Sequence, residues 1–133
     1  MDSRRPMKLL AAIGALLAAT APAASADWSQ AQPVTVITRD YEFSPARLVF
    51  KHGVAYRLHI DNRGKEQHEF TAPQFFKAAE IRDPTVLNAD KTEVEVPPGK
   101  AKDLEFVAPR PGRYPLRCSD HDWAGMTGEI TVE

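Results

Sequence analysis

The sequence predicts an all-β protein that folds as an antiparallel β-sandwich with Greek-key connections. Short runs in which apolar and polar residues alternate recur between residues 34 and 132, and a period of two is typical of strands with one buried face. Pro, Gly and Asn separate these runs, as expected of turns. Only one segment, 74–82, is compatible with a helical turn or two. About seven or eight short strands with little helix indicate two packed sheets.

The first group of expected strands lies before the helical segment. Residues 34–38 form a short β-branched run, and residues 48–50 form a second one. Residues 54–60 alternate apolar and polar side chains, which predicts a half-buried strand. The turn-forming stretch 61–64 ends it, and a short strand follows at 68–70, before Pro73.

The second group of expected strands follows the helical segment and is again divided by Pro and Gly. Its members are 93–96, the run that carries Leu104 and Phe106, 113–118 and 128–132, with turns at 97–99 and 109–112. No repeat or low-complexity stretch interrupts either group, so the strands are expected to form one domain.

The N-terminus has the three parts of a secretory signal peptide in order. Arg4, Arg5 and Lys8 provide positive charge, residues 9–19 are almost wholly apolar, and Ala24-Ser25-Ala26 provides small residues for cleavage. The apolar run is too short to span a bilayer. We therefore expect residues 1–26 to be a signal peptide, residues 27–133 to be the exported domain, and the protein to be periplasmic without stable membrane insertion.

Composition excludes some classes of function. The formal net charge of the chain is −1, and no basic run is present to bind a phosphate backbone, so nucleic acid is not expected as a partner. No Ser or Cys nucleophile lies in a recognisable hydrolase motif. The sequence thus predicts a protein that is not an enzyme.

Cys118 is the single cysteine of the chain. Exported proteins usually pair their cysteines, and a single thiol cannot form an internal disulfide. Such a thiol is buried and inert, reactive, paired with another chain, or bound to a metal.

The residues after Cys118 favour the metal. The run Cys118-Ser-Asp-His121-Asp-Trp-Ala-Gly-Met126 places a thiol, an imidazole and a thioether within nine residues. A second imidazole is available at His68. One Cys, two His and a weak axial Met form the ligand set of a blue-copper electron-transfer site.

Strand alternation predicts where these side chains point. Cys118 is in phase with the apolar residues of its strand, and Met126 is in phase with Ile130 and Val132. His68 shares a face with Phe70, so Glu69 is expected to point away from the site, with only its backbone N–H able to reach the sulfur. The other histidines, His52 and His59, fall in a turn and on an outward face, and we interpret both as surface residues.

The order Cys-x2-His-x4-Met-x-Gly resembles the loop of the cupredoxin family, with a spacing similar to that of plastocyanin. The preceding Gly-Arg-Tyr-x-Leu-x-Cys and the final Gly-Glu-Ile-Thr-Val add to the resemblance, which covers nearly all of residues 34–133. It implies one copper per chain, cycling between Cu(I) and Cu(II), with His68, Cys118 and His121 as equatorial ligands and Met126 as the axial one. Electrons would pass through the more exposed His121.

One position departs from the family pattern. Plastocyanin-like proteins often carry Asn after the first histidine, where it ties the two ligand loops together, but this chain has Glu69. The loop residue Trp123 is interpreted either as part of a partner-docking surface or an electron path, or as a lid packed on the sandwich. The group Arg110, Arg113 and Arg117 could recognise an acidic partner or form a solvated strand face balanced by acids.

Three roles remain open from the sequence. The first is an electron shuttle between periplasmic redox partners, which the absence of extra Met- or His-rich tracts favours. The second is a copper resistance or delivery protein. The third is the cupredoxin component of a ferrous-iron oxidation and uptake system, working with a membrane transport system. For this role, four acidic residues could attract Fe(II): Glu66, Glu69, Asp120 and Asp122. The sequence does not indicate the redox partner or the oligomeric state.

Overall fold

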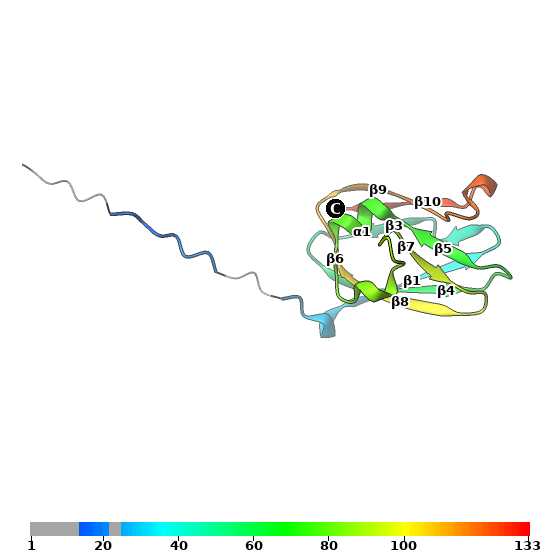
Figure 1. Cartoon of the computed structure of the whole chain (residues 1–133), viewed down its shortest axis with the longest axis horizontal. Helices are drawn as coiled ribbons and strands as arrows, with labels where there is room; N and C mark the ends of the chain where they lie inside the picture. Colours follow the sequence, from blue (N-terminus) through cyan, green and yellow to red (C-terminus); the bar gives the residue numbers. More distant parts are fainter. Residues whose placement is uncertain (1–13, 22–24) are drawn as a thin grey trace, which may run out of the picture.

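The computed structural model describes residues 14–21 and 25–133 and has two five-stranded sheets packed face to face (Figure 1). This two-layer arrangement with one short α-helix confirms the predicted all-β sandwich. The predicted signal peptide falls largely on residues 1–13 and 22–24, which lie outside the described residues. Among the described helices, none is both long and apolar enough to cross a membrane.

The first sheet has the strand order β2-β1-β4-β8-β6. Its central strand β4 pairs with β1 on one side and with β8 on the other. Its strands are β1 (Gln32–Arg39), β2 (Glu42–Ser44), β4 (Ala55–Asn62), β6 (Glu80–Ile81) and β8 (Ala101–Val107).

The second sheet has the order β3-β10-β9-β5-β7 and carries the residues of greatest interest. Its central strand β9 is joined to β10 over its full length but to β5 only at the pair Thr71↔Arg117. Its strands are β3 (Arg47–Phe50), β5 (His68–Thr71), β7 (Glu93–Val96), β9 (Gly112–Arg117) and β10 (Thr127–Val132).

Two strand pairs are parallel, whereas the sequence predicted antiparallel pairing. Strand β1 runs parallel to β4, and β10 runs parallel to β3. Parallel neighbours need a long connection between them. Here the chain leaves β1 through β2, crosses to the second sheet as β3, and returns as β4, so the connection itself is part of the sandwich.

The helical segment is shorter than predicted. Helix α1 (Pro73–Ala78) begins with a proline in its first turn, a position that suits the missing N–H of proline. The chain then becomes extended at Ala79, and β6 pairs with β8. Three 3₁₀-helices complete the described elements: η1 (Trp28–Gln30), η2 (Pro84–Val86) and η3 (Asp122–Ala124).

An aromatic cluster fills the space between the sheets. The ring of Phe106 on β8 lies 5.1 Å from the rings of both Phe50 on β3 and Phe75 on α1, with edge-to-face geometry at each contact. Tyr114 on β9 packs against Phe75 at 5.6 Å. Aromatic pairs of this geometry contribute about 0.5–1.5 kcal/mol each beyond their buried area. The cluster therefore fixes the two sheets, and α1 over their edge, as one rigid unit.

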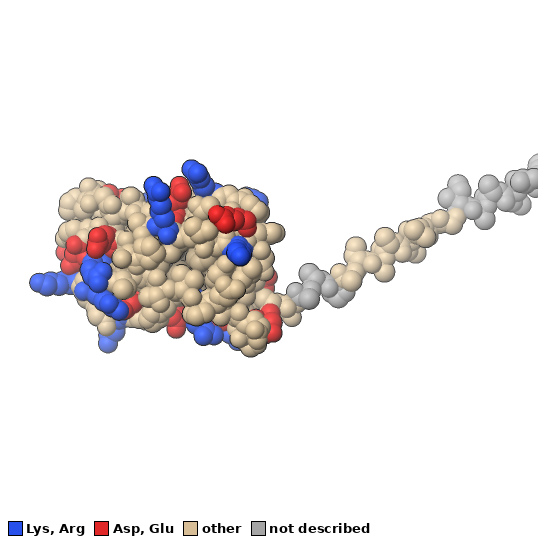
Figure 2. All heavy atoms as spheres, turned by 180° about the vertical axis from the view of Figure 1, so that it is seen from behind, with Lys and Arg blue, Asp and Glu red and all other residues tan. Residues whose placement is uncertain are grey.

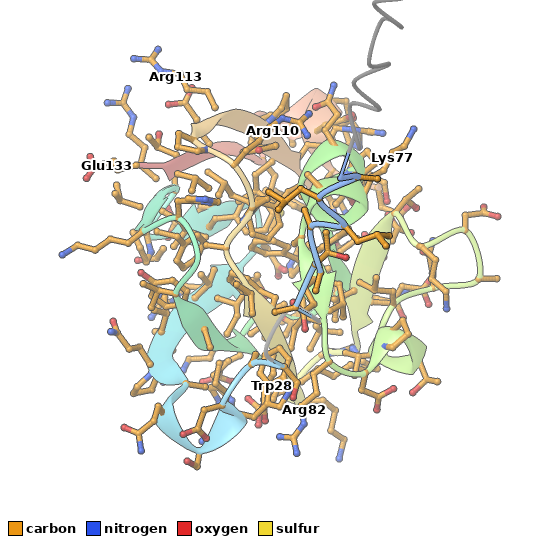
Figure 3. All side chains as sticks on the ribbon, turned by 90° about the vertical axis from the view of Figure 1, so that its left-hand side faces the viewer. Trp28, Lys77, Arg82, Arg110, Arg113 and Glu133 are labelled. Carbon is orange, nitrogen blue, oxygen red and sulfur yellow. The ribbon has the colours of Figure 1, made fainter. Side chains whose placement is uncertain are left out.

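The described chain enters the sandwich at one end of this unit. The guanidinium of Arg82 packs over the ring of Trp28 in η1, and its Cζ lies 5.7 Å from the ring centre (Figure 3). The 3₁₀-helix η3 and the beginning of β5 lie at the opposite end (Figure 1).

Candidate metal centre

Three candidate ligands from separate parts of the sequence meet at the end of the sandwich that carries η3. His68 begins β5, Cys118 follows β9, and His121 precedes η3. One ligand atom from each lies within 4.8 Å of the other two. His68 and Cys118 are buried, and His121 is partly buried.

Both imidazoles present the same nitrogen to the sulfur. The Cys118 Sγ lies 3.4 Å from Nδ1 of His121 and 4.0 Å from Nδ1 of His68. The two imidazole rings lie 4.9 Å apart in an edge-to-face arrangement. One thiol and two ring nitrogens thus converge on a common point.

The local backbone explains this convergence. Beyond the end of β9 the Cys118 N–H still donates to the carbonyl of Met126 at 2.9 Å, which extends the β9–β10 pairing. The His121 N–H then donates to the Cys118 carbonyl at 3.2 Å, closing a turn that brings the imidazole back over the sulfur. Gly125 adopts a left-handed φ of 83°, a conformation that favours glycine, and redirects the chain into β10.

Met126 lies next to this group in the same loop. Its side chain is fully buried and shares its face with Ile130 and Val132, as the alternation of β10 predicted. Its backbone N–H donates to the His121 carbonyl at 3.4 Å. The four predicted ligands therefore occupy one end of the sandwich, three of them fully or almost fully buried.

A carboxylate contacts the outer nitrogen of each imidazole. Nε2 of His68 lies 2.6 Å from Oδ1 of Asp40, and Nε2 of His121 lies 3.0 Å from Oε2 of Glu66. The sequence predicted Glu66 only as one of four acids that could attract Fe(II), and it gave no sign that Asp40 lies at the site. Asp40 lies in the β1–β2 turn, far from the ligands in sequence, so no local pattern could have revealed it.

Glu69 is a correction to the sequence prediction. Its backbone N–H donates to the Cys118 Sγ at 3.4 Å, as expected. However, its side chain does not point away from the site, because Oε2 accepts a hydrogen bond from the Cys118 thiol at 3.2 Å. The reason is that all four residues of β5 are buried, so both faces of this strand pack on protein. Glu69 is only 2% exposed.

The surroundings of Cys118 raise the pKa of its thiol. Burial raises the pKa of Cys118 to about 11, and the nearby Glu69 carboxylate adds to the rise, while the Glu69 backbone N–H opposes it. The metal-free thiol is therefore protonated at neutral pH. Any metal that binds the sulfur must displace this proton.

The two ligand loops are tied together by Thr71, Glu93 and Ser119, and not by an Asn after the first histidine as in plastocyanin-like proteins. Thr71 on β5 donates its hydroxyl to Glu93 Oε2 at 2.8 Å, and Ser119 donates to the same oxygen at 2.7 Å. The Ser119 N–H also donates to the Thr71 hydroxyl at 3.2 Å. The residue after Cys118 is thus fixed to both β5 and β7 without any contribution from the Glu69 side chain.

Aromatic side chains form the rim of the site. The ring of Tyr41 lies 4.9 Å from the His121 ring and 6.1 Å from the Trp123 ring. Trp123 is 77% exposed, and its Nε1 donates to the Asp120 carbonyl. Trp123 is therefore not a lid packed on the sandwich.

The remaining histidines lie on the surface, as predicted. Nδ1 of His52 lies 2.8 Å from the Pro109 carbonyl oxygen, and Nδ1 of His59 lies 2.6 Å from Oδ1 of Asp103. Neither belongs to the group formed by His68, Cys118 and His121.

The predicted arginine group does not form a single cluster. Arg117 pairs with Asp122 at 3.1 Å near the metal centre. Arg110 and Arg113 lie at the other end of the sandwich, spread across that end together with Lys77 (Figure 3). On the face shown in Figure 2, basic and acidic side chains are interspersed. These observations agree with a solvated surface balanced by acids.

The donor set fits copper. A thiol sulfur and two imidazole nitrogens suit a soft to borderline ion, and copper has the highest affinity for such sites among the divalent first-row metals. The thioether of the buried Met126, from the same loop, would further favour soft ions. The residues present could therefore hold one copper ion through His68, Cys118 and His121.

Comparisons with known proteins agree with this fold and donor set. The family model described as "Cupredoxin-like domain" matches residues 9–132. Auracyanin B is 21% identical, with a TM-score of 0.58 over 81% of this chain and 93% of its own. Na-dithionite-reduced auracyanin from Roseiflexus castenholzii is 17% identical, also with a TM-score of 0.58, over 77% of this chain and 98% of its own.

A larger protein shares the fold as well. McoA, a multicopper oxidase from Aquifex aeolicus, is 14% identical with a TM-score of 0.62; the match covers 83% of this chain but 31% of the oxidase. No curated protein sequence matches the chain significantly. At these identities the solved structures establish the fold of the chain.

Proposed function

Because this chain belongs to the cupredoxin-like domain family, we propose that it is a mononuclear type 1 copper protein that carries single electrons between redox partners. The observation that supports this proposal best is the convergence of three ligand atoms from separate parts of the sequence. A thiol and two Nδ1 atoms lie within 4.8 Å of one another at the ends of strands. Copper, when bound, supplies the one-electron couple between Cu(I) and Cu(II).

The residues of the chain hold the site in one arrangement. His68, Cys118 and His121 are the proposed equatorial ligands, and the buried Met126 is the proposed axial one. Strand β5, which carries His68, and the loop after β9, which carries Cys118, are joined by the Thr71–Glu93–Ser119 hydrogen bonds, and the aromatic core fixes the sheets. A site held this firmly changes little between oxidation states, which keeps the reorganisation energy small and electron transfer fast.

His121 is the proposed point of electron entry and exit. Its side chain is 13% exposed, whereas that of His68 is completely buried. Tyr41 packs against its ring and Trp123 packs against Tyr41, so a partner that docks on this end of the molecule would contact aromatic side chains near the imidazole. We place these partners in the periplasm, on the basis of the signal peptide predicted at residues 1–26.

The other two roles have less structural support. Rapid copper exchange would favour exposed ligands, but His68, Cys118 and Met126 are buried. Of the four acids expected to attract Fe(II), Glu69 is buried against the thiol, Asp122 pairs with Arg117, and Glu66 contacts His121. An electron carrier agrees best with these contacts.

Adding Cu(II) to the purified metal-free protein tests the proposal. We expect one copper to bind per chain and to give an intense thiolate-to-copper absorption in the visible range. Cys118→Ser should abolish this absorption, whereas His52→Ala, which removes a surface histidine, should leave it unchanged. A wild-type protein that stays colourless with its thiol reduced and Cu(II) in excess would rule out the type 1 assignment.

The ferrous-iron role is tested separately. Stopped-flow mixing of the Cu(II)-loaded protein with Fe(II) should show slow bleaching if the protein is a shuttle for protein partners. Fast bleaching that saturates with Fe(II) concentration would instead favour the iron-uptake role.

A further inference from the structure

We propose that Asp40 and Glu66 are positioning residues of the metal centre, which fix both imidazoles as Nδ1 ligands and favour the oxidised state of the bound copper, with Asp40 the dominant one. This inference rests on the proposed function, since it concerns the same site. It assigns a role to two residues that lie outside the ligand motif.

The contact of Asp40 with His68 is short and sheltered. Oδ1 of Asp40 lies 2.6 Å from Nε2 of His68, whose side chain has no exposed surface, and the Asp40 side chain is 25% exposed. The other carboxylate oxygen, Oδ2, accepts the backbone N–H of Lys65 at 3.0 Å. Both oxygens are thus engaged, so the carboxylate cannot rotate away from the imidazole without losing two hydrogen bonds.

Gly64 provides the space for this pair. A Cβ placed on Gly64 would lie 2.3 Å from Oδ1 of Asp40 and 2.8 Å from Nε2 of His68. Real Cβ atoms do not approach other atoms this closely, so any side chain at position 64 would displace the carboxylate or the imidazole. The backbone after β4 therefore passes directly over the Asp40–His68 contact.

Glu66 makes the equivalent contact on the other imidazole. Its Oε2 lies 3.0 Å from Nε2 of His121, but its side chain is 49% exposed. Solvent screens an exposed pair and reduces its contribution. We therefore expect Glu66 to have a smaller effect than Asp40.

The chemistry of the pairs determines the tautomer of each ring. An ionised carboxylate only accepts hydrogen bonds, so Nε2 must carry the proton and Nδ1 is left with its lone pair. The two Nδ1 atoms are those that face the Cys118 sulfur. Each carboxylate thus selects the form of the ring that can bind a metal at the shared point.

The same contacts influence the two oxidation states differently. An imidazole that donates its outer N–H to a carboxylate is a stronger donor to a metal. A stronger donor, with a negative charge behind it, stabilises the more highly charged Cu(II) relative to Cu(I). Removal of the charge should therefore raise the reduction potential.

The experiment compares Asp40→Ala, Asp40→Asn and Glu66→Gln in the full chain, with copper affinity measured by chelator competition and the potential by redox titration. Asp40→Ala removes the acceptor and should weaken copper binding about 10- to 100-fold. Asp40→Asn keeps an acceptor oxygen, so it should retain most of the copper affinity. Loss of the charge should shift the Cu(II)/Cu(I) preference by about tenfold, which raises the reduction potential by about 59 mV. Glu66→Gln should raise the reduction potential by a smaller amount.

Asp103→Asn is the matched control. Asp103 forms an aspartate–histidine contact of the same length with His59, on the exposed surface of β4 and β8. This variant should leave both the affinity and the potential unchanged. Gly64→Ala keeps the Asp40 residue but should displace its carboxylate or the imidazole, so it should also weaken copper binding, as Asp40→Ala does.

The outcomes separate this inference from the proposed function. If the wild type binds copper with the thiolate absorption but Asp40→Ala and Asp40→Asn behave like Asp103→Asn, the positioning role is wrong while the copper site stands. A larger effect of Glu66→Gln than of Asp40→Asn would overturn the dominance of Asp40. Thermal unfolding of each metal-free variant shows whether a weaker affinity comes from loss of fold, and Asp40→Asn, which preserves shape, provides the test if Asp40→Ala does not fold.

Discussion

Glu69 contacts the Cys118 sulfur twice, through its backbone N–H and through its carboxylate. The two contacts act in opposite directions, since the N–H stabilises a thiolate and the carboxylate disfavours it. A buried carboxyl beside the sulfur is also costly unless it is hydrogen-bonded, and Gln67 donates to it at 3.0 Å. This residue therefore makes the metal-free thiol harder to ionise.

Replacing Glu69 with Gln tests this effect. We expect the pKa of Cys118 to fall below about 11, because a negative charge next to the thiolate is removed. The pKa should nevertheless stay above its ordinary value, because burial is the largest cause of the rise. The measurement is a pH titration of thiolate ultraviolet absorbance in the metal-free protein.

Glu95→Gln is the control for this substitution. Glu95 lies opposite Glu69 on the neighbouring strand β7, but it is exposed. The thiol titration should be the same in this variant as in the wild type. An unshifted titration in Glu69→Gln would contradict the assigned role of the carboxylate.

At the scale of elements, the site depends on how β5, β7 and the loop after β9 are joined. Strands β5 and β9 share only one register pair, so their backbone ladder does not hold the loop in place. The Thr71–Glu93–Ser119 hydrogen bonds compensate for this, because they connect side chains of β5 and β7 with the residue after Cys118.

Thr71→Val should weaken this connection. The substitution preserves shape but removes the donor to Glu93 and the acceptor for the Ser119 N–H. Leaving a buried partner unsatisfied costs about 1–3 kcal/mol. Because Glu93 and Ser119 are partly buried and Glu93 still accepts from Ser119, we expect a loss at the lower end of this range, about 1 kcal/mol, in the free energy of unfolding measured by urea denaturation of the metal-free protein. The same substitution at Thr35, which is exposed on β1, should have a much smaller effect. Equal losses of unfolding free energy in the two variants would show that the Thr71–Glu93–Ser119 hydrogen bonds do not stabilise the fold.

The elements that sequence could predict are those with a long alternating pattern. Strand β4 alternates over all its eight residues, and its boundaries lie within two residues of the expected 54–60. Strand β10 begins one residue before the expected 128–132 and ends where expected. In contrast, β2 and β6 have three and two residues, too few to show a period. Parallel pairing of β1 with β4 was also beyond prediction, since periodicity gives the face of a strand but not its neighbour.

The candidate site divides in the same way. Cys118, His121 and Met126 lie close together in sequence, so their proximity could be inferred from one loop. Asp40 contacts His68 across 28 positions of sequence, and an isolated Asp in a turn carries no signal of such a contact. Glu69 was misplaced because strand alternation assumes one solvated face, whereas β5 is buried on both.

At the scale of the whole molecule, the ion pairs of Glu105 predict that the free energy of unfolding depends on pH. Glu105 on β8 accepts from Arg82 at 2.7 Å and from Arg57 on β4 at 3.4 Å. The hydrogen bond from Arg82 is the main reason that the pKa of Glu105 lies below its ordinary value. A carboxyl with a lowered folded-state pKa stabilises the fold above its unfolded-state pKa, and this contribution is lost as the pH falls through the folded-state value.

We therefore expect the free energy of unfolding to decrease as the pH falls below about 5, near the ordinary range of carboxyl groups. Urea denaturation of the metal-free protein at a series of pH values measures this decrease. In Glu105→Gln, stability at neutral pH should be lower and the dependence on pH shallower than in the wild type. The exposed Glu42 on β2 offers a control, since Glu42→Gln should leave the slope close to that of the wild type. A pH dependence unaltered by Glu105→Gln would count against the ion pairs.

The course of β1 has a practical consequence for work with this protein. The strand starts beside η1, where the described domain begins, and its eight residues carry the chain about 26 Å to the Asp40–Tyr41 turn beside His68. Molecules attached to an electrode through a linker ahead of Trp28 would all stand with His121 facing the electrolyte. Attachment through a residue of η3 would instead point His121 at the electrode. Voltammetry would then detect direct electron transfer between the electrode and the copper, whereas attachment ahead of Trp28 would leave His121 free to exchange electrons with dissolved partners.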